Sequence, residues 1–228
     1  MRISGYILLI SILFLPLQAH AQEDAKKESK AHGMFSFNGI GIQADMFGFA
    51  NSLLQDYTSG EIAVEANFGN RFYPVAEAGF GWSSTTDETS GIKYKAKAPY
   101  YRVGLNYNFF TNKEKPAPIH YIFGLVRFGW TSFEYDVNTP PINDPIWESS
   151  VALELDNVDG SCKWAEIGAG IKVKIAKGFH MGWSIRYKVR LKQEKGSNSN
   201  MWYIPGYGIN ESTCFGGTYS LIYEIPFR

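Results

Sequence analysis

The sequence contains few of the residues that most often carry chemistry. Its 228 residues include two cysteines and four histidines, without the Cys/His spacing of a metal site or the pattern of a calcium-binding loop. Basic and acidic residues are balanced at 22 each, so no net positive field is available to attract nucleic acid. The composition therefore predicts no metal, no cofactor and no nucleic-acid partner.

Long apolar runs are also scarce, and the one that is present lies at the start of the chain. Residues 6–15 are apolar apart from one serine, but this run is too short to span a bilayer core of about 30 Å as a helix. Arg2 precedes the run, and the small-x-small segment Ala19-His20-Ala21 follows it. We therefore predict a secretory signal peptide over residues 1–21, cleaved before Gln22; the alternative is an uncleaved anchor.

The rest of the chain divides into a short tail and one domain. No second apolar run of about 18 residues is present, so the sequence predicts no membrane-spanning helix. Residues 22–33 are polar and charged without an apolar face, and we interpret them as a flexible periplasmic tail. Loss of Arg2 with the signal peptide leaves 21 basic and 22 acidic residues, a net charge of −1. Residues 34–228 are predicted to form the folded domain.

This domain shows an alternation of apolar and polar residues with period two, which is the pattern of β-strands. It is clearest in Phe179–Lys192, where one face is entirely apolar and the other carries four basic residues. A strand of a soluble sandwich can show the same alternation. The length of the segment favours a membrane strand, because those need about 9–11 residues whereas globular strands average about 5–6.

Eight such segments can be recognised, which is an even number, as in bacterial membrane barrels. Short and long connections alternate between them, as they do between the periplasmic turns and outer loops of such barrels. Near Asn38-Gly39 the alternation changes phase, which predicts a β-bulge. The sequence thus predicts an all-β fold, an eight-stranded antiparallel up-and-down transmembrane β-barrel, with strands near residues 35–46, 61–68, 72–83, 101–109, 121–133, 164–175, 179–192 and 219–227.

At this point the chain resembles the small eight-stranded outer-membrane barrels of the OmpA/OmpX kind, over residues 35–228. The resemblance depends on the strand pattern, the turn asymmetry and the terminal segment Tyr219–Arg228. It implies the outer membrane of a Gram-negative bacterium and barrel-insertion machinery that reads an aromatic residue at the end of the last strand. Here Phe227 is penultimate, which departs from that pattern. The pattern of residues along the chain is also similar to that of barrel proteins exported by Bacteroidota.

If the apolar faces point outward, the polar faces collect charges of both signs inside the barrel. An eight-stranded barrel is just wide enough for side chains to fill it, and opposite charges buried together must pair. We therefore predict a plugged lumen with a salt-bridged interior; the alternative is a narrow or gated ion pathway. The predicted network consists of Asp45, Glu65, Glu77, Arg102, Arg127, Glu166, Lys172, Arg186, Lys188, Arg190 and Glu224.

Two further features lie near the predicted outer rim. The exported compartment permits a disulfide between Cys162 and Cys214, although one strand lies between their strands; the alternative is two unpaired thiols. The last long loop carries Trp202, Tyr203 and Tyr207, which are either a surface-binding site or a structural cover folded onto the rim.

Three functions remain open. The first is a monomeric outer-membrane barrel with a structural or surface-interaction role, in contact with outer-membrane lipid and lipopolysaccharide, and without enzymatic activity. The second is a lipid-modifying barrel enzyme, for which no Ser/His/acid set can be assembled at the outer rim: His180 and Ser184 lie roughly 13 Å apart along one strand. The third is an exported soluble ligand-binding barrel resembling lipocalins, which requires apolar residues inside and polar residues outside.

Overall fold

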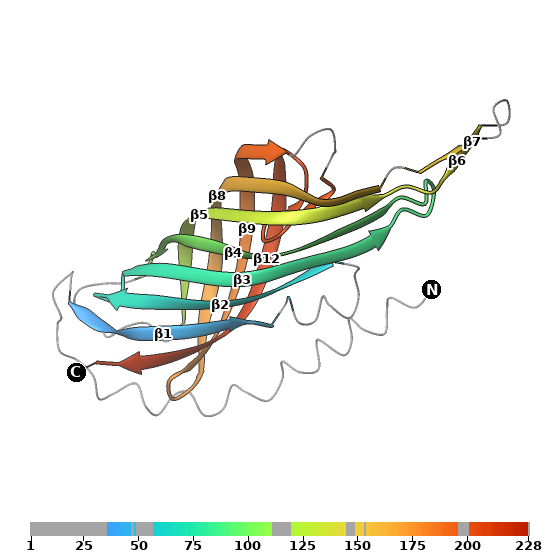
Figure 1. Ribbon diagram of the computed structural model, residues 1–228. Coiled ribbons are helices and arrows are strands. Elements are labelled where there is room, and N and C mark those ends of the chain that lie inside the picture. Colours follow the sequence, from blue (N-terminus) through green and yellow to red (C-terminus); the bar gives the residue numbers. More distant parts are fainter. Residues whose placement is uncertain are drawn as a thin grey trace.

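The computed structural model describes residues 36–46, 48, 57–110, 120–144, 149–152, 154–195 and 201–227. The predicted signal peptide and tail lie outside these residues. Eight long strands form a closed antiparallel barrel in the order β1-β12-β9-β8-β5-β4-β3-β2 (Figure 1). These strands are β1 (Phe37–Asp45), β2 (Tyr57–Phe68), β3 (Phe72–Thr86), β4 (Lys93–Asn108), β5 (His120–Asn138), β8 (Glu154–Ala176), β9 (Phe179–Lys195) and β12 (Thr213–Pro226).

Two small hairpins complete the described chain. β6 (Ile142–Asp144) pairs with β7 (Ser149–Val151), and β10 (Tyr203–Ile204) pairs with β11 (Gly208–Ile209). In Figure 1, β3, β4, β5 and β8 extend well beyond the rest of the barrel, and the β6–β7 hairpin projects furthest. Within the described ranges, no helix has the length and apolar character needed to cross a membrane.

The barrel has two distinct ends, which follow from the lengths of its connections. At the turn end, β2 and β3 are joined by a tight turn in which Gly69 and Asn70 have φ of 59° and 57°. Those are values that glycine and asparagine adopt most readily. The β8–β9 turn at Gly178 lies at the same end, as do the start of β1 and the end of β12. The opposite end, called the loop end below, carries the β1–β2, β3–β4, β5–β8 and β9–β12 connections, of which β3–β4 is reduced to residues 87–92 by the extension of its two strands.

The sequence prediction of an eight-stranded antiparallel barrel is confirmed, and so is the bulge near Asn38-Gly39, where the β1–β2 register shifts between Phe37 and Gly39. Several strands are longer than predicted, always toward the loop end. β4 begins at Lys93 rather than near residue 101, and β8 begins at Glu154 rather than near residue 164. The added segments pair in register with neighbouring strands, so they extend the sheet beyond the apolar belt described below.

Candidate functional site

The alternation along each strand places apolar side chains on the outside of the barrel and polar ones inside. In β9, Ile185 is 70% exposed whereas its neighbour Arg186 is 2% exposed. Strand geometry requires this opposition, because successive side chains point to opposite faces of a sheet. The exposed apolar residues form a continuous belt around the barrel, which we call the outer belt. On β8, for example, the outer belt runs from Ala165 to Val173.

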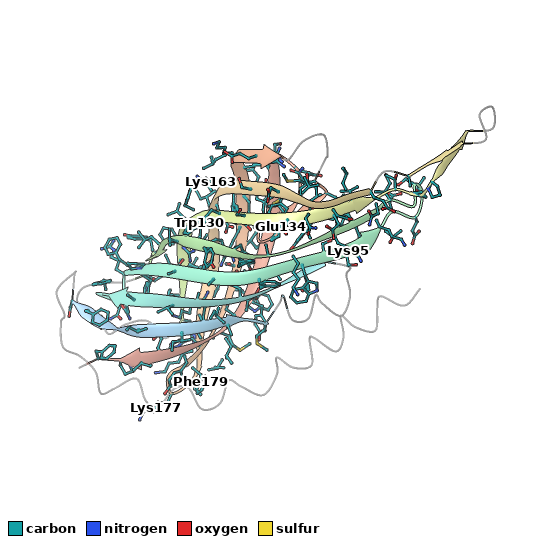
Figure 2. All side chains as sticks on the ribbon, viewed as in Figure 1. Lys95, Trp130, Glu134, Lys163, Lys177 and Phe179 are labelled. Carbon is teal, nitrogen blue, oxygen red and sulfur yellow. The ribbon has the colours of Figure 1, made fainter. Side chains whose placement is uncertain are left out.

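Aromatic rings gather near both limits of the outer belt. At the turn end, Phe37 lies 5.5 Å from Phe68 and 5.4 Å from Phe227 between ring centroids. Phe179 lies 4.8 Å from Tyr223 in the same girdle, beside the Lys177 turn (Figure 2). A second group lies toward the loop end and contains the ring pairs Tyr101–Trp130 and Tyr187–Phe215, while the pair Trp183–Tyr219 lies between the two groups.

The outer face changes from apolar to polar and charged side chains just beyond the second group of rings. On β5, Trp130 is followed toward the loop end by Ser132, Glu134 and Asp136, and the same outer face of β4 carries Lys97, Lys95 and Lys93, with Lys95 paired with Asp136. All of these side chains except Asp136, which is half-buried, are exposed. An apolar belt bounded by aromatic rings and then by charged residues is the distribution expected for the outer surface of a membrane barrel.

Inside the barrel, the residues nearest the turn end form a small ionic cluster. Lys172 on β8 contacts Glu65 on β2, and its Nζ lies 2.6 Å from Oε1 of Glu224 on β12. The ammonium also lies 5.4 Å from the ring centroid of Tyr73 and 5.9 Å from that of Tyr121. Lys172 is 2% exposed, so this cluster compensates a fully buried positive charge.

The middle of the barrel holds a larger cluster of three arginines and three glutamates. Glu77 is its centre: its carboxylate lies 2.8 Å from Nε of Arg102, 2.8 Å from Nε of Arg127 and 3.1 Å from Nη1 of Arg186. Glu166 lies 3.1 Å from Arg102 and 3.4 Å from Arg186. Glu61, the third glutamate, pairs with Arg102. The three positive and three negative charges of this cluster are therefore equal in number.

Toward the loop end, the charged interior gives way to aromatic packing. Trp164 is completely buried, and its Nε1 donates a hydrogen bond of 2.7 Å to Glu166. Tyr100 donates a hydrogen bond of 3.0 Å to Oε2 of Glu61. Beyond them lies an apolar cluster to which β4, β5 and β8 contribute inward residues and to which the segment from Met201 to Tyr207 contributes Met201, Tyr203, Ile204 and Tyr207.

The segment 201–209, which includes the β10–β11 hairpin, covers this cluster, and we call it the cap. Its attachment is polar as well as apolar, because Nζ of Lys188 donates hydrogen bonds of 2.9 Å and 3.0 Å to the carbonyls of Gly206 and Tyr207. Tyr94 donates a hydrogen bond of 2.7 Å to the carbonyl of Tyr203.

The predicted surface-binding loop needs correction. Tyr203 and Tyr207 are 3% and 1% exposed, because both rings belong to the apolar cluster beneath the cap. Trp202 is 38% exposed, and its ring lies 6.2 Å from that of Tyr94. The sequence prediction treated the three aromatics alike, whereas the fold uses Tyr203 and Tyr207 to anchor the cap.

Of the predicted network, eight residues take part in ion pairs inside the barrel, namely Glu65, Glu77, Arg102, Arg127, Glu166, Lys172, Arg186 and Glu224. The other three have different partners. Lys188 binds the cap carbonyls, Arg190 donates from Nη1 to Oδ1 of Asn210, and Asp45 accepts a hydrogen bond from the backbone of Tyr219.

The predicted charge network omitted two members of the interior. Glu61 lies on the same face of β2 as Glu65, and a strict continuation of the period-two alternation would have included it. His180 Nε2 lies 3.7 Å from Oε2 of Glu224 at the turn end. Its pairing required the register between β9 and β12, which sets His180 opposite Ile222 and brings Glu224 within reach.

The two cysteines are both free thiols. The disulfide that the sequence permitted is therefore absent, and the register explains why. Cys162 on β8 is paired with Gln193 of β9, whereas Cys214 on β12 is paired with Lys188 of β9, five positions away. Cys162 lies outside the outer belt and is 1% exposed, and burial raises the pKa of its thiol to about 11.

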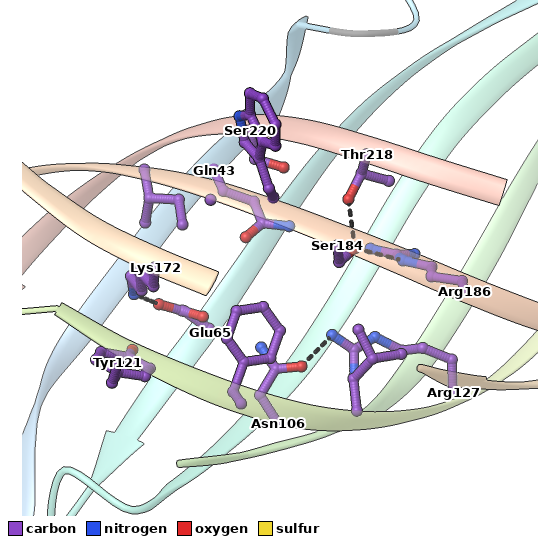
Figure 3. A pocket seen from close by; sticks show the side chains of 15 residues that line it. Gln43, Glu65, Asn106, Tyr121, Arg127, Lys172, Ser184, Arg186, Thr218 and Ser220 are labelled. Carbon is purple, nitrogen blue, oxygen red and sulfur yellow. Dashed lines mark hydrogen bonds and ion pairs between the residues drawn. The ribbon is translucent and has the colours of Figure 1, made fainter. Parts of the chain in front are cut away.

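Very little empty space remains between the charged layers. A cavity of about 20 Å³ lies among residues of both ionic clusters (Figure 3). This volume is close to the minimum that a single water molecule requires. Hydrogen bonds bridge its walls: Arg127 Nη2 donates to Asn106 at 2.7 Å, and the hydroxyls of Ser184 and Thr218 lie 2.6 Å apart. Among the described residues, no group of three or more His, Cys, Asp or Glu is placed to hold a metal ion.

Comparison with known proteins assigns a family. Residues 2–228 match the family model described as a domain of unknown function (DUF6048). The chain belongs to this family. A search of curated proteins finds no match.

Among solved structures, the DUF6048 chain is similar to Ail, the attachment invasion locus protein of Yersinia pestis. One Ail structure matches with 12% identity and a TM-score of 0.40, covering 84% of this chain and 100% of Ail. Another, in complex with the heparin analogue sucrose octasulfate, matches with 11% identity and a TM-score of 0.37, covering 83% and 97%. The function proposed below rests instead on the geometry of this chain.

Proposed function

We propose that this DUF6048 protein is an outer-membrane β-barrel with a sealed lumen, which acts through its outer surface and loops rather than by transport or catalysis. One observation carries the proposal, namely that the barrel is apolar outside and charged inside. Ile185 at 70% exposure and Arg186 at 2% are adjacent in one strand. A soluble barrel would have to expose its polar face to water, so this arrangement opposes the lipocalin-like alternative.

The sealed lumen is supported by the contents of the barrel. The two ionic clusters, the ring of Trp164 and the cap follow one another from the turn end to the loop end. The cavity between them has room for about one water molecule. An open ion pathway would need continuous space along the axis, so we favour a plug.

The proposal includes the remaining parts of the chain. Residues 1–21 act as a signal peptide that is removed on export, residues 22–33 form a periplasmic tail, and residues 34–228 form the barrel. The turn end then faces the periplasm and the loop end faces outward, where it meets lipopolysaccharide. Barrel-insertion machinery is the expected partner during assembly, and the inserted protein is monomeric.

The lipid-modifying enzyme is the second candidate, but the described histidines do not favour it. His180 lies at the turn end, where its Nε2 faces Glu224, while Ser184 shares a hydrogen bond with Thr218. His120 begins β5, also at the turn end. A nucleophile and base at the outer leaflet would have to come from the loop end.

Membrane fractionation of a Gram-negative host that expresses the full chain tests the proposal. We expect the protein in the outer-membrane fraction, with different gel mobility before and after boiling. A freely soluble periplasmic protein that migrates identically under both conditions would overturn the membrane assignment. Mass spectrometry of the purified protein tests the cleavage, since an N-terminus at Gln22 is expected.

A further inference from the structure

A furrow runs along β3 on the outside of the barrel, within the outer belt. Its volume is about 280 Å³. The floor consists of two alanines, Ala76 and Ala78, whose side chains both point outward and are exposed. Register pairs Ala76 with Val64 and Val103, and Ala78 with Ile62 and Tyr101, so larger side chains on β2 and β4 form the two walls.

A positive charge lies just beyond the loop end of this furrow. Phe80 is the next outward residue of β3 after Ala78, and Nζ of Lys97 lies 5.7 Å from the centroid of its ring. Lys97 is exposed and is paired in register with Trp82. Glu134 lies across from it on β5 but is not within ion-pair distance, and no ion pair of Lys97 occurs within the described ranges. The ammonium is therefore available to a ligand.

The combination of an apolar furrow and an ammonium at one end fits an amphiphile with an anionic head. The furrow lies at the depth of the acyl chains if the outer belt marks the bilayer core, and Trp82, Tyr101 and Trp130 lie near the level of the headgroups. A linear alkyl chain can lie along β3 because the small side chains of Ala76 and Ala78 leave room for it. The larger side chains of Ile62 and Val64 leave no such room along β2. A phosphate is the anion that membrane lipids present at this level.

We propose that the furrow binds one acyl chain of a phosphorylated lipid and that Lys97 binds its phosphate. This inference rests on the proposed membrane function, and the orientation proposed above, with the loop end outward, identifies the lipid as lipid A of the outer leaflet. Occupation by a second copy of the chain is the competing outcome. The site requires no movement of the barrel, because every residue in it already faces outward.

Native mass spectrometry of the folded protein in detergent tests the site, with monophosphoryl lipid A and its dephosphorylated form as probes. We expect one phosphorylated lipid on the wild type and a loss of about ten-fold in affinity for Lys97→Gln, the effect of one charge-assisted hydrogen bond. The matched control is Lys163→Gln, which removes an exposed lysine on β8, three strands from β3, and is expected to bind normally.

Filling the furrow supplies a second, independent test. Ala78→Phe is expected to abolish lipid retention, whereas Ala169→Phe, at an exposed alanine on β8 outside the furrow, is expected to retain it. Equal binding by Ala78→Phe and the wild type, equal losses for Lys97→Gln and Lys163→Gln, equal retention of the dephosphorylated lipid, or a dimer in place of the lipid complex would each overturn the inference.

Failure of the underlying membrane function would look different. Each variant is first checked for the boiling-dependent gel shift of a folded barrel. A wild type without that shift contradicts the proposed function itself. A wild type that shows the shift but retains no lipid contradicts only the lipid site.

Discussion

Glu77 and Arg186 come from opposite sides of the barrel, and Nη1 of Arg186 lies 3.1 Å from Oε2 of Glu77. Their strands, β3 and β9, are four strands apart in either direction around the closed sheet. Lys172 and Glu65, on β8 and β2, are also four strands apart and are also in contact. Polar contacts thus connect opposite walls at two levels, so the interior is organised by charge at the turn end and in the middle, and by an apolar cluster only toward the loop end.

Removal of Glu77 is expected to destabilise the barrel strongly. Glu77→Ala leaves Arg102, Arg127 and Arg186 without their shared carboxylate in a buried site. Breaking a buried ion pair on one side costs about 3–5 kcal/mol, because an uncompensated charge remains. Urea unfolding of the protein refolded in detergent micelles, followed by tryptophan fluorescence, measures the loss of free energy of unfolding.

The control for this experiment is Glu134→Ala, which removes an exposed carboxylate from the outer face of β5. A change within about 0.5 kcal/mol is expected there. If both variants lose the same stability, the central cluster does not stabilise the barrel in the way described.

Ion conductance provides a test of the cap and of the two ionic clusters as barriers inside the lumen. The wild type is expected to give no steady conductance in planar bilayers. Deletion of the cap, residues 201–209, is expected to leave it closed, because Glu77 and Arg186 still bridge the lumen beneath. Only the cap deletion combined with Glu77→Ala, Arg186→Ala and Lys172→Ala, which removes the bridges at both levels, is expected to conduct. Steady conductance of the wild type would contradict the plug.

The outer belt predicts where a new charge will be tolerated. Ile185→Arg places a cation in the middle of the belt, where it is expected to cost about 2–4 kcal/mol and to reduce membrane insertion. Ser132→Arg, outside the belt beyond Trp130, is expected to cost about 0–1 kcal/mol. The fraction of heat-modifiable protein in the outer membrane measures both. Equal tolerance at the two positions would mean that the belt does not contact lipid.

Much of the fold could be predicted because strand alternation is a local signal. In β9, each residue from Phe179 to Arg186 alternates between the two faces, and reading that pattern required no knowledge of its neighbours. The identity of the pairs inside the barrel could not be read in this way. Glu77 meets Arg186 because β3 and β9 lie opposite one another, which depends on closure of the whole sheet.

The sequence left choices open, or gave the wrong strand bounds, where tertiary context overrides composition. For Tyr203 and Tyr207 the sequence left open a surface-binding site or a cover folded onto the rim; the mouth of the barrel offers the apolar surface of Trp164 and Tyr135, and the cap folds onto it. The added lengths of β4 and β8 were missed because their outward residues are charged there, so the apolar alternation stops while the backbone pairing continues.

The free thiol of Cys162 allows the cap to be monitored directly. Cys162 is 1% exposed beneath the cap, and burial raises the pKa of its thiol to about 11, so the reactive thiolate is rare at neutral pH. Maleimide labelling of the folded protein is therefore expected to be slow, and its rate is expected to rise about ten-fold per pH unit below that pKa while the protein stays folded.

Lys188→Ala removes both hydrogen bonds to the carbonyls of Gly206 and Tyr207, and it is expected to accelerate labelling at constant pH by freeing the cap. Cys214→Ser in both proteins confines the measurement to Cys162. Rapid labelling of Cys162 in the Cys214→Ser protein with Lys188 intact would contradict the packing of the cap. In the unsubstituted protein, a failure to label both cysteines after unfolding without reductant would show that they are bonded.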